Sequence, residues 1–221
     1  MSAPLVAIVT GASRGIGKGV ALELGAIGAT VYLTGRTATP GGFLPGTVGA
    51  TASLVDELGG RGIGVVCDHH VDADVEAVVA RAVAEQGRVD VLVNNVFSAP
   101  ALAQWLGRPF WELPLEAWDE VIDIGVRSHY VAARAVAPTM IREGDGLIVN
   151  VSSSGAVQYA HTVSYGVGKA ALDRMTADMA HELRPHGVAV VSVWPGLGGQ
   201  SWSSSVRRTA RSSSPGRGRS T

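Results

Sequence analysis

One stretch near the start of the chain decides the fold: Leu5-Val6-Ala7-Ile8-Val9, followed directly by Thr10-Gly11-Ala12-Ser13-Arg14-Gly15-Ile16-Gly17. The first five residues are a continuous apolar run, as expected of a parallel strand that is buried on both faces. The glycine-rich turn then leads into a helical pattern. In such a unit, the pyrophosphate of a dinucleotide can lie against the free N–H groups of the first helical turn. We therefore expect a nucleotide to contact the turn at Gly11, Ser13, Arg14, Gly15, Ile16 and Gly17.

The rest of the chain repeats this alternation of strands and helices. The expected strands are 5–9, 30–33, 62–66, 90–93, 147–151 and 188–193. The helices expected after the first one are 53–58, 72–85, 118–141 and 164–183. This alternation predicts an α/β fold, a Rossmann-like doubly wound parallel sheet with the strand order 3-2-1-4-5-6. The Gly/Pro-rich segment 36–47 is expected to be a loop.

Composition and charge exclude several classes of protein. The chain has 221 residues, 46% of them hydrophobic, which is enough for one sizeable domain with a real core. Residues 1–206 hold 13 of the 18 basic groups and all 19 acidic ones, and an acidic body argues against nucleic acid as the main partner. We find no apolar run long enough to span a membrane, no signal peptide in Met1–Val9 and no metal-ligand pattern. The single Cys67 fits a reducing compartment, so we expect a cytoplasmic protein.

A possible proton-transfer pair lies near the start of the helix expected at 164–183. Tyr165 and Lys169 are four residues apart in Tyr-Gly-Val-Gly-Lys, a spacing that puts both side chains on one helical face. A lysine ammonium beside a phenol favours the phenolate and lowers the phenol's pKa from about 10, as a proton-shuttling tyrosine requires. Ser153, just after the fifth expected strand, could hydrogen-bond the substrate oxygen that Tyr165 protonates. Alone, the pair is a weak signal, because surface tyrosines often lie near lysines.

The end of the second expected strand bears on the choice between NAD and NADP. An acidic residue there would accept hydrogen bonds from the ribose hydroxyls, whereas an arginine would pair with a 2′-phosphate. The chain has Gly35-Arg36 and no acid at this point, and Arg14 can reach the same phosphate. NADP(H) is therefore favoured over NAD(H). The alternative is that Arg36 is simply a solvated arginine on a loop.

These features together resemble the short-chain dehydrogenase/reductase family, and the resemblance covers residues 4–198. The shared motifs are the turn Thr10–Gly17, Asn94-Asn95 after the fourth strand, Tyr165 with Lys169, and Pro195-Gly196 after the sixth strand. Val96-Phe97 replaces the Ala-Gly that follows the two asparagines in the family. Further segments resemble the family's member-1 branch: Phe110-Trp111-Glu112, Gln158-Tyr159 and Tyr165–Ala171.

The resemblance implies hydride transfer between NADP(H) and a carbonyl/alcohol pair. Tyr165 would be the general acid in reduction, Lys169 would also hold the nicotinamide ribose, and Ser153 would position the substrate oxygen. Ser152 stays open as the alternative serine, because the family's commonest spacing to the tyrosine selects it. The resemblance also implies a homodimer through helix 118–141. It counts Tyr165 and Lys169 among the expected cofactor contacts and adds four more residues to them: Asp68, Asn94, Pro195 and Gly196.

Two departures from the family lie around this site. Gly125 stands where the family has an asparagine that helps to hold a water, so the expected catalytic tetrad becomes a triad. His129, one turn further on, is either a proton shuttle or a satisfied or interface histidine. The substrate is expected to be apolar and larger than ethanol. Five aromatic residues either line its pocket or pack in the core and loops: Phe97, Trp105, Phe110, Trp111 and Tyr159.

The largest departure follows Pro195-Gly196. We expect a domain at 1–198 and a disordered basic, Ser/Arg-rich tail at 199–221. The tail resembles neither the family's substrate-covering helix nor its seventh strand, and it looks like a truncated or shifted reading frame. We therefore expect the seventh strand to be missing. An alternative function is an NADP(H)-binding scaffold or sensor of the same fold, catalytically impaired because it lacks this lid.

Overall fold

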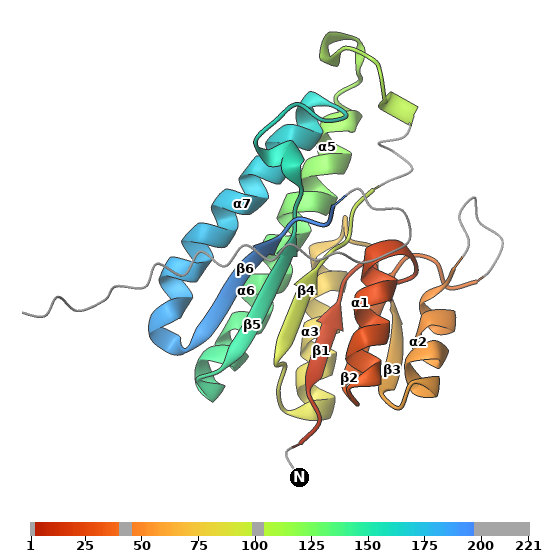
Figure 1. Ribbon diagram of the computed structural model, residues 1–221, viewed down its shortest axis with the longest axis vertical. Coiled ribbons are helices and arrows are strands. Elements are labelled where there is room, and N and C mark those ends of the chain that lie inside the picture. Colours follow the sequence, from red (N-terminus) through yellow and green to blue (C-terminus); the bar gives the residue numbers. More distant parts are fainter. Residues whose placement is uncertain (1–2, 40–45, 99–103, 197–221) are drawn as a thin grey trace, which may run out of the picture.

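The computed structural model describes residues 3–39, 46–98 and 104–196. Its centre is a parallel sheet in the order β3-β2-β1-β4-β5-β6 (Figure 1). The strands are β1 Val6–Val9, β2 Thr30–Gly35, β3 Arg61–Val66, β4 Val91–Asn94, β5 Gly146–Val151 and β6 Val188–Val193. In the register, Ala7 of β1 pairs with Val31 on one side and with Val91 on the other. The predicted fold class and strand order are confirmed, and the predicted seventh-strand loss and tail at 199–221 lie outside the described residues.

The helices follow the strands in the expected alternation. They are α1 Gly15–Ala26, α2 Val48–Glu57, α3 Asp72–Gln86, α5 Glu116–Ile122, α6 Ser128–Glu143 and α7 Val163–Leu183. Short 3₁₀ helices occur at η1 Phe110–Glu112, η3 Ser154–Ala156 and η4 Arg184–His186. Among the described helices, none combines the length and the apolar composition that a bilayer crossing requires.

Two helices differ from the sequence prediction. The helix expected at 118–141 is divided: η2, a π-helical segment at Asp123–Arg127, separates α5 from α6. Helix α2 begins at Val48, five residues before the predicted start at 53. Its start is fixed by Thr47, whose Oγ1 accepts a hydrogen bond from the N–H of Ala50 at 3.0 Å. The cap lies within the segment that composition alone predicts to be a loop.

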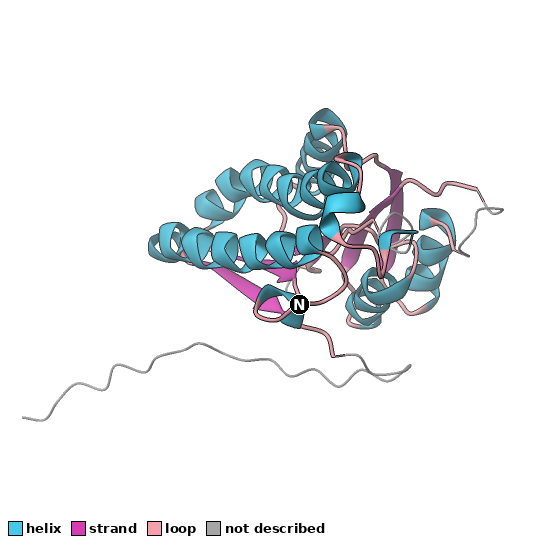
Figure 2. Cartoon of the chain, turned by 90° about the horizontal axis from the view of Figure 1, so that it is seen from above, coloured by secondary structure: helices cyan, strands magenta, loops and turns pink. Residues whose placement is uncertain are grey.

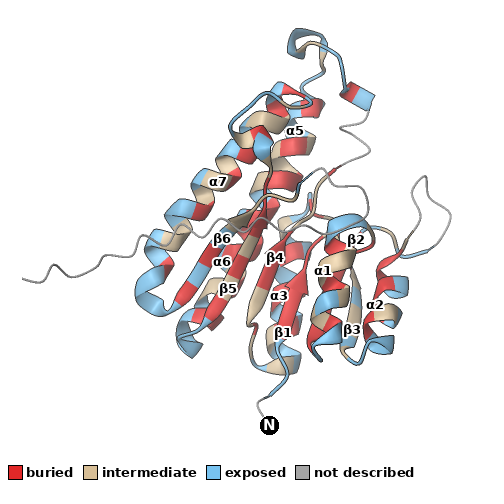
Figure 3. Cartoon of the chain, in the orientation of Figure 1, coloured by how far each residue is buried: buried red, intermediate tan, exposed pale blue. Residues whose placement is uncertain are grey.

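Helices flank both faces of the sheet (Figure 2), and an apolar core lies on each face. On one face, α3, α6 and α7 pack against strand residues such as Ile8, Leu92 and Ile148, all of them buried. On the other face, α1 and α2 cover the half of the sheet formed by β1, β2 and β3 (Figure 1). Strands β1 and β2 are therefore buried on both sides, as the colours of Figure 3 show. On the second face of β6, Val191 is 40% exposed to solvent among the described residues.

A buried polar ladder crosses the sheet just below its carboxyl edge. Asn94 Nδ2 donates to Asn150 Oδ1 at 2.9 Å, and Asn150 Nδ2 donates to Thr176 Oγ1 at 2.8 Å. Both asparagines are fully buried, and Thr176 is 6% exposed. The ladder therefore joins β4, β5 and α7 through buried hydrogen bonds, and any unpaired member would carry a desolvation penalty.

We predict that Thr176→Val destabilises the chain more than Thr176→Ser. Valine has the same shape but no acceptor, so the buried amide of Asn150 loses its partner, at a cost of about 1–3 kcal/mol in the free energy of unfolding. Serine keeps the hydroxyl and loses a methyl group, at a cost of about 0.8 kcal/mol. Urea denaturation measures both values. A valine variant at least as stable as the serine variant would contradict a stabilising role for the ladder.

Candidate active site

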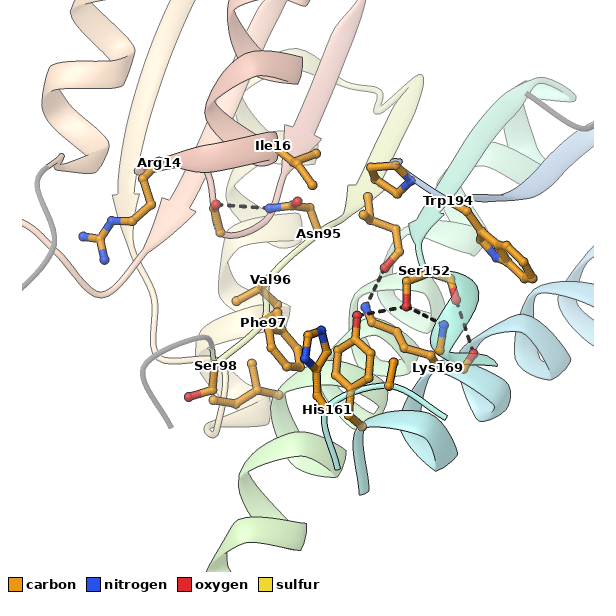
Figure 4. Close-up of a pocket in the computed structure, with 18 of the residues that line it drawn as sticks. Arg14, Ile16, Asn95, Val96, Phe97, Ser98, Ser152, His161, Lys169 and Trp194 are labelled. Atoms are coloured by element: carbon orange, nitrogen blue, oxygen red, sulfur yellow. Dashed lines mark hydrogen bonds between the residues drawn. The ribbon is translucent and has the colours of Figure 1, made fainter. Parts of the chain in front are cut away.

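A cavity of about 870 Å³ lies at the carboxyl edge of the sheet. It is lined by residues that follow β1, β2, β4, β5 and β6, together with residues of α7 (Figure 4). The cavity includes the point between β1 and β4 at which the strand order reverses, and ligands bind at such points in open α/β sheets. The described lining residues include no Asp or Glu. The described part of the chain also contains no group of three or more His, Cys, Asp or Glu side chains placed to hold a metal ion.

The glycine turn is held tightly against the segment after β4. Gly11 has φ +65°, and a Cβ atom there would lie 2.7 Å from the Cα of Val96. Thr10 Oγ1 accepts hydrogen bonds from the N–H groups of Asn95 and Val96 at 2.9 and 3.1 Å. A residue with a side chain at 11 would therefore separate the two segments. Of the expected turn contacts, the cavity lining includes Gly11, Ser13, Arg14 and Ile16 but not Gly15 or Gly17.

Two arginines lie at the end of the cavity next to β2. Arg14 Nη2 donates to Thr37 Oγ1 at 3.0 Å and to the Gly46 carbonyl at 3.1 Å. Its Nε is buried and has no partner among the described residues. Arg36 is exposed and also lines the cavity. Two guanidinium groups at one rim can hold an anion such as a phosphate.

Tyr165 and Lys169 of helix α7 line the cavity, and Lys169 lies at the end away from Arg14 (Figure 4). The helix begins after Thr162, whose Oγ1 accepts a hydrogen bond from the N–H of Tyr165 at 3.1 Å. The hydroxyl groups of Tyr165 and Ser153 are 2.9 Å apart. Lys169 is 8% exposed, and its Nζ donates to the Val151 carbonyl at 2.9 Å. Burial lowers the pKa of Lys169 to about 8, although the charge of Asp173 acts in the opposite direction.

The ring of Tyr165 is packed between two other rings. The Phe97 ring contacts it edge-on with centroids 5.5 Å apart, and the His161 ring contacts it edge-on at 4.8 Å. A Cβ atom at Gly155 would lie 2.6 Å from Cε1 of the tyrosine, so this position has room for glycine only. His161 has φ +63°, which is uncommon outside glycine. The phenol hydroxyl is therefore held in one place beside Ser153.

The structure separates the two candidate serines. The Ser153 hydroxyl lies against Tyr165, whereas the Ser152 hydroxyl is buried and donates to the Lys169 carbonyl at 3.3 Å. Of the two, only Ser153 is therefore placed to share a ligand oxygen with the tyrosine.

Besides Gly15 and Gly17, two more of the expected cofactor residues do not line the cavity. Asn94 is fully buried in the polar ladder, and Asp68 accepts hydrogen bonds from the N–H and Nδ1 of His70, both at 3.1 Å. Asn95 lines the cavity in place of Asn94, and its Nδ2 donates to the carbonyls of Thr10 and Gly11 at 2.8 and 3.1 Å. The only sign of Asn95 in the sequence was its place as the second residue of the Asn94-Asn95 pair. The other expected contacts in the lining are Arg36, Tyr165, Lys169, Pro195 and Gly196.

Gly125 and His129 lie beneath the cavity. His129 is 1% exposed, its Nε2 donates to the Val96 carbonyl at 3.1 Å, and its Nδ1 has no partner among the described residues. Burial, reinforced by the nearby Lys169, lowers the pKa of His129 to about 3, so the imidazole is uncharged at neutral pH. Gly125 is buried in η2, and a Cβ atom there would lie 3.7 Å from the Phe97 ring.

Of the five aromatic residues considered for the substrate pocket, Phe97 is the one that the described lining includes. Trp105 is buried, whereas Phe110, Trp111 and Tyr159 are between 62% and 78% exposed. Trp194, which the sequence did not single out, lines the cavity just before Pro195.

Comparison with known sequences gives one family. A family model described as short chain dehydrogenase matches residues 5–209. "Dehydrogenase/reductase SDR family member 1" of Mus musculus is 48% identical over 202 residues, covering 89% of this chain and 62% of that protein. The Homo sapiens protein of the same name is 45% identical with the same coverage. The chain therefore spans about 62% of the length of these two relatives.

Solved structures of the same fold bind either cofactor. A metagenomic short-chain oxidoreductase in complex with NADP has a TM-score of 0.76 at 35% identity, covering 87% of this chain and 82% of that one. NAD⁺-bound xylitol dehydrogenase has a TM-score of 0.76 at 28% identity, covering 87% and 70%. The family model matches most of the chain, and the sheet, the glycine turn and the helix with Tyr165 and Lys169 are all present. The chain therefore belongs to the short-chain dehydrogenase family.

Proposed function

We propose that the chain is an NADP(H)-dependent oxidoreductase that interconverts a carbonyl compound and its alcohol. The observation that carries the proposal is the 2.9 Å contact between the hydroxyls of Ser153 and Tyr165, with buried Lys169 beside them in the cavity that also contains the glycine turn. When bound, the nicotinamide supplies hydride to the carbonyl carbon or accepts it from the alcohol.

The three side chains take separate roles in this proposal. The Tyr165 hydroxyl donates its proton to the substrate oxygen during reduction and takes it back during oxidation. The Ser153 hydroxyl donates a hydrogen bond to the same oxygen and opposes the build-up of negative charge there. The ammonium of Lys169 favours the phenolate that remains after proton transfer.

The residues present fit a dinucleotide phosphate. The pyrophosphate would lie at the N-terminus of α1, against the turn from Gly11 to Ile16. Because Gly11 has no side chain, the segment after β4 can lie close to this turn. Arg14 and Arg36 would hold the 2′-phosphate, which is what supports NADP(H) over NAD(H). Pro195 and Gly196 also line the cavity.

The end of the cavity near Tyr165 supports an apolar carbonyl substrate. The cavity lining includes the apolar residues Phe97, Ile124, Val151 and Ala160. Polar groups come from Gln158, His161 and the three serines at 152–154. A ketone or aldehyde with an apolar body can therefore be buried here while its oxygen reaches the hydroxyl pair.

We predict that Tyr165→Phe lowers kcat by about 10²–10⁴-fold while leaving the Kd for NADPH unchanged, because it removes the transferable proton and keeps the ring. The measurement is NADPH oxidation with a panel of ketones and aldehydes, alongside fluorescence titration of NADPH. Unchanged turnover would refute the assignment. NADPH binding without turnover of any panel compound by the unaltered chain would favour the catalytically impaired scaffold instead.

The two adjacent serines offer a matched pair. Ser153→Ala should lower kcat because the substrate oxygen loses a hydrogen bond, whereas Ser152→Ala removes a hydroxyl that the protein already uses internally. We expect kcat for Ser152→Ala to stay much closer to that of the unaltered chain. The reverse order would move the catalytic role to Ser152.

We predict that Arg36→Ala raises the Kd for NADPH by about 10- to 100-fold, as expected for the loss of a charged hydrogen bond to phosphate, and leaves the Kd for NADH unchanged. Arg61→Ala, at the amino end of β3, is the control because that arginine lies at the opposite edge of the sheet. Equal weakening of both cofactors, or of neither, would contradict a role for Arg36 in choosing NADP(H).

A further inference from the structure

The carboxylate of Asp173 receives three hydrogen bonds from the end of β6. Ser192 Oγ donates to Oδ1 at 2.6 Å, and Trp194 Nε1 donates to Oδ2 at 3.1 Å and to Oδ1 at 3.3 Å. Asp173 lies on α7 one turn after Lys169, so both side chains share one face of the helix. One carboxylate therefore fastens the end of β6 to the helix that carries the proton-transfer residues.

What this carboxylate holds is part of the cavity wall. Trp194 lines the cavity and is followed by Pro195 and Gly196, which line it too (Figure 4). A displaced indole would take these two residues with it, since they are its immediate neighbours in the chain. The hydrogen bonds of Asp173 therefore fix where this rim of the cofactor cavity lies.

The same carboxylate lies one turn of α7 after Lys169, a buried cation. Lys169 faces the rings of Phe97 and Tyr165, the Val151 carbonyl, and the uncharged His129 beneath it. The described cavity lining contributes no carboxylate. Burial lowers the pKa of Lys169, and the charge of Asp173 is the influence that raises it.

We propose that Asp173 is a positioning residue with two separable actions: its charge keeps Lys169 protonated, and its hydrogen bonds to Trp194 hold the rim at Pro195-Gly196. The proposal rests on the proposed function for its effect on turnover. Neither action requires turnover to be measured, because one is a titration and the other is a binding constant.

The lysine titration can be read directly, because the chain contains only two lysines, Lys18 and Lys169. NMR of the chain labelled with ¹³C-lysine gives one titrating signal for each, and Lys18→Arg assigns them. Asp173→Asn keeps a similar shape and an acceptor for the indole but removes the charge. We expect its Lys169 midpoint to fall by about half to one pH unit. Asp173→Ser, a second uncharged replacement, must give a fall in the same direction.

The hydrogen bonding of Trp194 to Asp173, which we call the tether, is tested with Trp194→Phe. This substitution removes the indole N–H and leaves the carboxylate charged. The Kd for NADPH should rise by about 3- to 10-fold, as expected when part of the free energy of one lost hydrogen bond is passed on to the cofactor site, while the Lys169 midpoint stays in place. Asp178→Asn is the control, because Asp178 lies on the exposed face of α7 in an ion pair with Arg174. It should change neither quantity.

An unchanged Lys169 midpoint in both uncharged variants would overturn the electrostatic action, and an unchanged Kd in Trp194→Phe would overturn the tether. If the unaltered chain neither reduces a carbonyl compound nor oxidises an alcohol, the proposed function fails, while the titration and the Kd still decide the role of Asp173.

Discussion

The burial of a single ammonium group is the constraint on which the site depends. Lys169 is 8% exposed, and removal of a charge from water is costly unless nearby groups compensate. Besides the charge of Asp173, the compensation comes from the Val151 carbonyl at 2.9 Å and from two aromatic faces, Phe97 and Tyr165, whose ring centroids lie 5.3 and 5.8 Å from Nζ. Both rings therefore stabilise the buried cation, and the tyrosine among them is the one whose hydroxyl lies against Ser153.

The rest of the fold serves to bring this helix and the glycine turn to one edge. Parallel strands place all their carboxyl ends on the same side, so residues after β1, β4, β5 and β6 converge although they are far apart in sequence. Gly11 allows β1 and the segment after β4 to touch, and Gly155 allows the tyrosine ring to approach the segment after β5. Loss of either close approach would alter the distance between the two halves of the cavity.

Sequence reasoning predicted the sheet order and the Tyr–Lys face because both follow from periodicity, which a single chain displays. It could not resolve neighbouring polar residues at a strand end. Asn94 and Asn95, like Ser152 and Ser153, are adjacent, and consecutive side chains point to opposite sides of extended backbone. An assignment that is wrong by one residue therefore selects the buried residue of the pair instead of the partly exposed one. No local sequence pattern shows which of the two residues points into the cavity. The π-helical segment at Asp123–Arg127 was not predicted for a related reason. One extra residue in a single turn leaves the apolar pattern of a long helix almost intact.

Because the described cavity lining contains no acidic group, binding of the cofactor is linked to the protonation of Lys169. A nicotinamide dinucleotide would carry the negative charge of its pyrophosphate into a cavity that has Arg14 and Arg36 at one end and Lys169 at the other. An anion nearby favours the charged form of an amine, and binding and protonation must then strengthen each other by the same free energy. A lysine whose pKa burial has brought to about 8 is sensitive to such a charge at physiological pH, whereas one titrating above 10 would already be fully protonated. The low pKa is therefore what makes the state of Lys169 responsive to an occupied cofactor cavity.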